Sequence, residues 1–186
     1  MINIAEYLQQ VRFDIKALLF DWGNTVMKVL PGLEGPMAFW PTVAAVDGIQ
    51  DILPVLKEHY VLALLSNARH SDQSLVRRAL ARVNLDHYFQ AIFTPQELNL
   101  HKPAPQFYFN VLRQIGVEPE HAIMIGDDYQ NDIIAAKQVG LWTIWYNPDQ
   151  QQRPSECYPY HDAVISHLHE VVAVIKEKLA AIRPKI

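Results

Sequence analysis

The chain has 186 residues, half of them apolar and 19% charged, with a net charge of −4 and one cysteine, Cys157. This length suits one domain, and the negative charge excludes general attraction to nucleic acid or to an anionic membrane. A single cysteine excludes an internal disulfide, and no stretch approaches the roughly 20 apolar residues that cross a bilayer. The first residues lack the basic and apolar regions of a secretory signal. We therefore expect one cytoplasmic domain over residues 1–186.

In the N-terminal part of the chain, segments with the hydrophobic pattern of a helix alternate with segments that have the pattern of a buried strand. Residues 2–11 predict a short amphipathic helix, and residues 16–21 predict a buried strand. Residues 28–47 are rich in Pro and Gly and predict a loop or one short helix. Residues 48–58 have helical spacing, with an internal proline that starts or distorts the helix, and residues 60–65 predict a second buried strand.

The middle of the chain repeats this alternation. Ser71 and Asp72 are good helix caps, so we expect a helix from there to about Val83. Residues 91–94 predict a short third strand. Residues 105–116 predict a helix that begins near a proline and stops at a glycine.

The last third of the chain predicts a strand at 122–125, a helix at 131–140 and a strand at 141–146. A short strand at 163–165 and a helix at 167–182 follow. Strands that alternate with helices form right-handed crossovers and a parallel sheet. The near-continuous apolar strands agree, because helices cover both faces of such a sheet. The fold class is therefore α/β, a three-layer Rossmann-like parallel sheet.

Polar side chains that suit phosphate chemistry follow four apolar runs. Because parallel strands end at one edge of a sheet, we expect these groups to converge there. A carboxylate can attack phosphorus, a hydroxyl and backbone N–H groups can hold phosphate oxygens, a lysine can offset charge, and clustered carboxylates can hold Mg²⁺. The residues are Asp21, Ser66, Asn67, Lys102, Asp127, Asp128 and Asp132.

Four fragments in this order resemble the motifs of the haloacid dehalogenase superfamily of aspartate-nucleophile hydrolases. Each fragment alone is weak, but all four occur in family order, and the resemblance spans roughly residues 16–146. It implies a Rossmann-like core with a minimal cap, the loop 28–47, and phosphatase activity on a phosphorylated substrate with Mg²⁺ as cofactor. The fragments are Asp21 to Thr25, Leu64 to Asn67, Lys102 to Pro105, and Ile125 to Asp132.

The resemblance implies a role for each motif residue. Asp21 would be the nucleophile that forms an aspartyl-phosphate, and Lys102 would pair with it and with the phosphate. Ser66 and the backbone of Asn67 would bind the phosphoryl group. Asp127 would bind Mg²⁺ together with Asp21. Supporting roles would fall to three further residues: Thr25, Asp128 and Asp132.

Gly23 departs from the family pattern. Most family phosphatases carry an Asp there, which protonates the leaving oxygen and activates water, and such groups are typically worth 10²–10⁴-fold. Gly23 keeps the backbone carbonyl through which the family binds Mg²⁺, and Asn24 tolerates the left-handed backbone of the next position. Dehalogenases and phosphonoacetaldehyde hydrolases also lack this Asp, but both rely on a large cap for which the sequence between Asp21 and Ser66 is too short.

Two alternatives to a phosphatase stay open at this point. The chain could be a phosphate-binding or regulatory module that has lost turnover at Gly23. It could also be a receiver-like phospho-acceptor, but there the acidic pair follows the first strand, whereas here one Asp follows it. The order of the motifs therefore favours the hydrolase over the receiver.

Several aromatic and histidine residues near the motifs have simpler explanations. Trp22, Trp142 and Trp145 suit packing, and Phe39 and Trp40 suit the core better than a lid. The histidines beside motif residues suit the surface, and a pair two residues apart does not share a helical face, so it does not suit a metal. His70 and His101 are the histidines beside motif residues, and His167 and His169 are the pair two residues apart.

Overall fold

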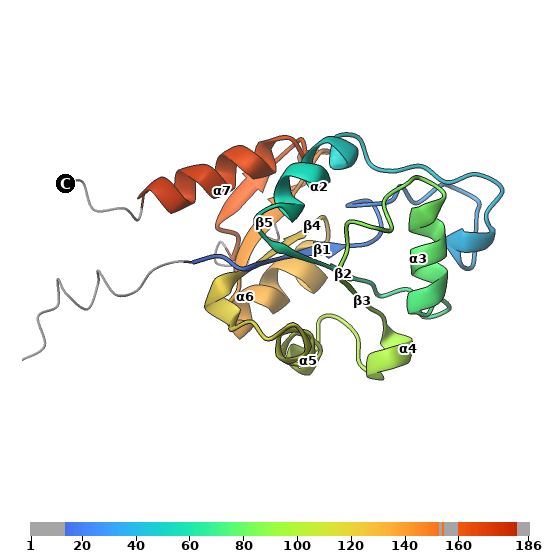
Figure 1. Ribbon diagram of the computed structural model, residues 1–186, viewed down its shortest axis with the longest axis horizontal. Coiled ribbons are helices and arrows are strands. Elements are labelled where there is room, and N and C mark those ends of the chain that lie inside the picture. The colour runs from blue at the N-terminus through green and yellow to red at the C-terminus, as the bar shows by residue number, and fades with distance from the viewer. Residues whose placement is uncertain (1–13, 153, 155–159, 182–186) are drawn as a thin grey trace, which may run out of the picture.

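Within the described residues, six strands form one parallel sheet at the centre of the protein (Figure 1). The computed structural model describes residues 14–152, 154 and 160–181, so the helix expected at 2–11 and Cys157 lie outside the described residues. The strands are β1 (Ala17–Asp21), β2 (Val61–Leu65), β3 (Ala91–Phe93), β4 (Ala122–Gly126), β5 (Trp142–Tyr146) and β6 (Ala163–Ile165).

The order of the strands is β3-β2-β1-β4-β5-β6, so the chain moves outward on one side of β1 and then crosses to the other side at β4. Asp21 pairs in register with Leu65 of β2, and Phe20 pairs with Ile125 of β4. In open α/β sheets a crevice forms outside the carboxyl ends of the strands where the order reverses. Here that point lies between β1 and β4, which end at Asp21 and Gly126.

Helices cover both faces of the sheet, as the apolar strands predict (Figure 1). Side chains of β1 alternate between two clusters, because successive residues of a strand point to opposite faces. The helical segments are η1 (Met37–Phe39), α2 (Ile49–Lys57), α3 (Gln73–Ala81), α4 (Pro95–Leu98), α5 (Pro105–Ile115), η2 (Pro119–His121), the π-helix η3 (Tyr129–Ile134), α6 (Ala135–Val139) and α7 (Glu170–Ala181).

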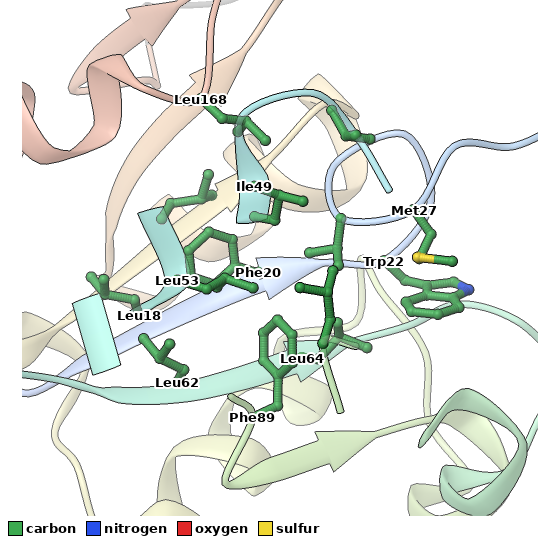
Figure 2. Close-up of a cluster of buried hydrophobic side chains, with 14 of the residues drawn as sticks. Leu18, Phe20, Trp22, Met27, Ile49, Leu53, Leu62, Leu64, Phe89 and Leu168 are labelled. Atoms are coloured by element: carbon green, nitrogen blue, oxygen red, sulfur yellow. The ribbon is translucent and has the colours of Figure 1, made fainter. Parts of the chain in front are cut away.

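Leu18 and Phe20 of β1 pack with side chains of α2, α3 and α7 on one face. Figure 2 shows Phe20 between Leu53 of α2 and Phe89, which lies before β3. Leu19 packs with residues of α5 and α6 on the other face. These two buried layers hold β1 from both sides and position the residues that follow it.

The sequence-based elements agree with this architecture, with differences at three places. α2 runs through Pro54, and the helix predicted at 131–140 consists of η3 followed by α6. The short helix α4 was not predicted, because only four residues separate Thr94 from Asn99. Thr94 begins it as a side-chain cap, and Asn99 ends it in left-handed conformation.

The segment 28–47 is a loop with one short helix, η1, as predicted. Arg82, which follows α3, donates hydrogen bonds to the carbonyl oxygens of Met37 and Trp40 at 3.2 and 2.6 Å and so holds this segment. Trp40 is buried, but the expected core position of Phe39 is wrong. The Phe39 side chain is 62% exposed, and its ring lies 5.2 Å from the guanidinium of Arg78.

Trp22 and Trp145 are buried, and Trp142 packs against the edge of the core, so the packing prediction for the three tryptophans is confirmed. His70 and His101, which lie beside motif residues, are exposed, as expected. Among the described residues, no helix is long and apolar enough to cross a bilayer.

Candidate active site

The predicted site residues meet at the carboxyl edge of the sheet, around the point where the strand order reverses. Asp21 ends β1, Ser66 directly follows β2, and Asp127 directly follows β4. Lys102 comes from the segment before α5. These residues line a cleft of about 300 Å³, together with the turn after β1 and Asn131 of η3.

Lys102 is the buried centre of this site. Its Nζ contacts Asp21 Oδ1 and donates to Asp132 Oδ1 at 2.6 Å and to the Leu65 carbonyl at 3.3 Å. Burial acts to lower the pKa of Lys102, but the charges of Asp132 and Asp21 outweigh burial and raise the pKa. Lys102 is therefore a permanent ammonium that fixes the carboxylate of Asp21.

Asn67 holds the segment that carries Lys102. Its side-chain Nδ2 donates to the Lys102 carbonyl, and its Oδ1 accepts from the Lys102 N–H, both at 2.9 Å. The sequence indicated only a backbone role for Asn67, so this reciprocal pair is new information from the structure. It ties the end of β2 to the lysine loop, 35 residues further along the chain.

Ser66 is fully buried, and its Oγ accepts a hydrogen bond from Ala68 N–H at 3.0 Å. Asp72 caps α3, as predicted, so neither Ser66 nor Asn67 serves as the cap of that helix. Ser66, Asn67 and Ala68 line the cleft, and the Asn67 N–H, unlike that of Ala68, donates to no described residue. A hydroxyl and backbone N–H groups at one place suit a phosphate group.

The first loop has the shape that the sequence predicted. Asn24 adopts a left-handed backbone with φ of 57°, and its side chain accepts from the Val29 N–H at 3.0 Å. The N–H groups of Val26 and Met27 donate to the Trp22 carbonyl and close the turn. Thr25 is fully buried and donates to Asp127 Oδ1 at 3.2 Å, so it joins this loop to the end of β4.

A residue of β5 also holds Asp127 in place. The indole Nε1 of Trp145 donates to the Asp127 carbonyl at 3.0 Å. Burial, followed by the charge of Asp21, raises the pKa of Asp127 to about 6. The sequence indicated only packing for Trp145, although its place near the carboxyl end of a strand is the same signal that marked the other site residues.

Asp128 and Asp132 both accept hydrogen bonds from neighbouring protein groups. Asp128 Oδ1 accepts from the N–H groups of Gln130 and Asn131 at 3.0 and 2.9 Å, so this carboxylate caps η3. Asp132 is fully buried, and its Oδ2 accepts from the Asp128 N–H at 3.2 Å. The expected supporting roles thus take a structural form: Asp128 shapes the loop, and Asp132 pairs with Lys102.

A divalent cation fits the donors that remain. One oxygen each of Asp21, Asp127 and Asp132 lie within 4.8 Å of one another. Both oxygens of Asp132 already accept hydrogen bonds, whereas Asp21 Oδ2, Asp127 Oδ2 and the Gly23 carbonyl accept none from any described residue. Three carboxylates face the single ammonium of Lys102, which leaves a deficit of about two positive charges, and hard oxygen donors suit Mg²⁺.

We expect Lys102→Met to lower the free energy of unfolding by about 3–5 kcal/mol, because two nearly buried carboxylates lose their counter-charge. Urea unfolding monitored by tryptophan fluorescence measures this change. Lys28→Met is the matched control, since the Lys28–Asp47 pair is exposed and such pairs contribute about 1 kcal/mol or less. Equal losses in the two variants would contradict a buried ionic centre.

A comparison of this chain with protein families finds a match over most of its length. The family model described as haloacid dehalogenase-like hydrolase matches residues 19–146, which is more than half of the chain. This range contains all the cleft residues described above.

Among curated relatives, a glyceraldehyde 3-phosphate phosphatase of Pyrococcus furiosus is 28% identical over 128 residues, covering 68% of this chain and 52% of the relative. A pyrimidine 5′-nucleotidase of Streptococcus pneumoniae is 35% identical over 124 residues, covering 62% and 51%. A phosphoserine phosphatase of Thermus thermophilus is 33% identical over 110 residues, covering 59% and 42%. The chain thus spans about half the length of the curated relatives it matches.

Solved structures support the fold. A protein of Listeria monocytogenes serotype 4b matches with a TM-score of 0.78 at 23% identity, covering 90% of this chain and 99% of that one. A 2-haloacid dehalogenase of Pseudomonas syringae matches with a TM-score of 0.72 at 18% identity, covering 88% and 99%. At these identities the likeness concerns the α/β fold with its parallel sheet.

Proposed function

This chain belongs to the haloacid dehalogenase-like hydrolase family, and we propose that it is a Mg²⁺-dependent phosphatase that acts through an aspartyl-phosphate on Asp21. The observation that carries the proposal is the environment of Asp21. Lys102 holds one oxygen of this carboxylate at the edge of the cleft, and no described residue donates to the other. A carboxylate that is held in place at the edge of a cleft, with one oxygen free of hydrogen bonds from described residues, suits nucleophilic attack on phosphorus.

The other residues of the cleft have complementary roles in this proposal. Ser66 and the N–H groups of the loop after β2 bind the phosphoryl oxygens, and Lys102 offsets their charge. Asp21, Asp127 and the Gly23 carbonyl hold Mg²⁺, which supplies further charge neutralisation when bound. Thr25 and Trp145 keep Asp127 in place through its carboxylate and its carbonyl, respectively.

The curated relatives support the class of reaction, because the three named above are called phosphatases or a nucleotidase. Their substrates differ from one another, so they support no particular substrate here. Gly23 limits the kind of phosphate ester that the site can hydrolyse quickly. Without a side-chain acid at this position, we propose that acyl and aryl phosphates, whose leaving groups need little protonation, are turned over faster than alkyl phosphates.

We expect acetyl phosphate and p-nitrophenyl phosphate to be hydrolysed in the presence of Mg²⁺, with the rate lost in excess EDTA and restored by added Mg²⁺. Mg²⁺ should also raise the melting temperature, because a ligand that binds the folded state stabilises it. Phosphate release and differential scanning fluorimetry provide the two measurements. Turnover that is equal with and without EDTA would contradict the metal-dependent mechanism.

A further inference from the structure

A second cavity, of about 330 Å³, adjoins the cleft and plays no part in the chemistry described so far. The two share Asn24 and Asp127, so the second cavity begins where the first loop meets the end of β4. Its other walls include Lys28 and Asp47 from the segment after the first loop and Tyr146 from the end of β5. A molecule whose phosphate lies in the cleft can therefore extend its remaining part into this space.

The loop after β5 is built as a wall of this cavity. Asn147 Nδ2 donates to the Gln151 carbonyl at 3.0 Å, and Gln151 N–H donates to Asn147 Oδ1 at 2.8 Å. This reciprocal pair closes the loop, and Pro148, Asp149 and Gln151 of the loop line the cavity. The wall is thus fixed by hydrogen bonds of its own and does not depend on a ligand for its shape.

Tyr146 offers this cavity an unused hydrogen bond. The residue is only 7% exposed, yet its hydroxyl bonds to no other described residue. Burial, and then the charges of Asp47, Asp127 and Asp149, raise the pKa of Tyr146, so the phenol stays protonated. Among the described residues, only His121 Nδ1 is a fully buried side-chain polar atom without a partner, so the Tyr146 hydroxyl is open to the cavity and can bond to a ligand there.

The charges around the cavity select against anions. Asp47, Asp127 and Asp149 line it, and among the described residues Lys28 is the one cation there, already paired with Asp47 at 2.8 Å. With Asp47 offset by Lys28 and Asp127 by the Mg²⁺ of the proposed function, Asp149 still leaves the cavity negative, so a leaving group with its own carboxylate or second phosphate would meet repulsion there. Hydroxyl groups can instead donate to the carboxylates and accept from Tyr146.

We propose that this cavity binds the part of the substrate beyond the phosphate and that this part is an uncharged polyhydroxyl group, as in a sugar or sugar-alcohol monophosphate. The proposal rests on the proposed function, because it takes the cleft as the phosphate site. It concerns preference among alkyl phosphates, all of which turn over more slowly than acyl phosphates without an acid at position 23. It adds that Tyr146 determines specificity by donating a hydrogen bond to a substrate hydroxyl.

A matched pair of substrates tests the proposal by turnover. Sorbitol 6-phosphate and 6-phosphogluconate differ only at the far carbon, which is an alcohol in the first and a carboxylate in the second. We expect kcat/KM to be about 10-fold higher for sorbitol 6-phosphate than for 6-phosphogluconate. We also expect Tyr146→Phe to lower turnover of sorbitol 6-phosphate relative to that of acetyl phosphate by about 3- to 10-fold. Tyr88→Phe, near Lys57 at the end of α2, is the control that keeps this ratio.

A binding measurement separates failure of this inference from failure of the proposed function. In the Asp21→Asn protein with Mg²⁺, calorimetry should show sorbitol 6-phosphate binding about 10-fold more tightly than methyl phosphate, which is too small to reach the cavity. Equal affinities for the two phosphates would overturn the proposed subsite, and so would a Tyr146→Phe variant with unchanged affinities. Both results hold whether or not the protein turns over any phosphate. If the native protein does not hydrolyse acetyl phosphate, the proposed phosphatase function is wrong. The comparison of the two affinities still decides whether the cavity is a substrate subsite.

Discussion

Asp21→Asn is expected to lower Mg²⁺-dependent hydrolysis of acetyl phosphate by at least about 10³-fold, because loss of a catalytic nucleophile removes the covalent route and costs several orders of magnitude in kcat. The substitution keeps the size of the side chain but removes its charge and most of its nucleophilicity. Lys102 keeps its second carboxylate, Asp132, at 2.6 Å, so we expect the variant to fold. Steady-state phosphate release, measured with both proteins at saturating Mg²⁺, gives the comparison.

Mass spectrometry adds an independent test of the nucleophile. Acid-quenched native protein should gain one phosphoryl group that hydroxylamine removes, and Asp21→Asn protein should not. Asp72→Asn is the matched control, because it makes the same chemical change at the cap of α3, where Asn is an equally good cap. Equal turnover in native and Asp21→Asn protein would exclude Asp21 as nucleophile. Phosphate and Mg²⁺ binding without turnover in the native protein would instead favour a regulatory module.

Gly23→Asp is expected to raise kcat/KM on alkyl phosphates by about 10²-fold or more, because it supplies the acid that the proposed mechanism lacks. The structure shows a steric obstacle to this substitution. A Cβ atom on Gly23 would lie 3.1 Å from Cγ2 of Val29, which is closer than ordinary contact. Val29 is 48% exposed, so its side chain has room to turn toward solvent.

Removing the obstruction sharpens the Gly23 experiment. The double variant Gly23→Asp, Val29→Ala should exceed the single variant on methyl phosphate, since the Val29 methyl groups no longer compete with the new carboxylate. Val29→Ala alone is the control, and it keeps the backbone N–H that donates to Asn24 at 3.0 Å. A double variant that folds and binds Mg²⁺ but shows no gain would mean that the missing acid is not what limits turnover.

The strands and the edge at which they end were predictable because burial on both faces demands unbroken apolar runs. Leu18 and Leu19 belong to opposite clusters of the core, which is why period-two alternation is absent from this strand. Short elements were not predictable in the same way. The helix α4 is too brief to show a helical period, and only its cap, Thr94, marks it.

For the site, too, some features were predictable from the sequence and others were not. The carboxylates and Lys102 were identified from residue type and position after a strand, and the structure brings them to one cleft. Which way each carboxylate turns was not in the sequence. Asp128 turns to cap η3, and Asp132 turns to Lys102 rather than to the open cleft. Phe39 was misplaced for a similar reason, because a Pro- and Gly-rich segment has no period that assigns its side chains to a face.

The sequence by itself determined the family, the parallel sheet and the residue types of the site, since these depend on apolar runs and on short motifs that are local along the chain. The tertiary structure alone decided which groups share a hydrogen bond. Lys102 meets Asp21 across 81 positions of sequence, and Thr25 meets Asp127 across 102. It also decided that Val29 fills the space beside Gly23 and that Tyr146 lines a cavity next to the cleft. Such contacts arise from packing between distant segments, which no local pattern encodes.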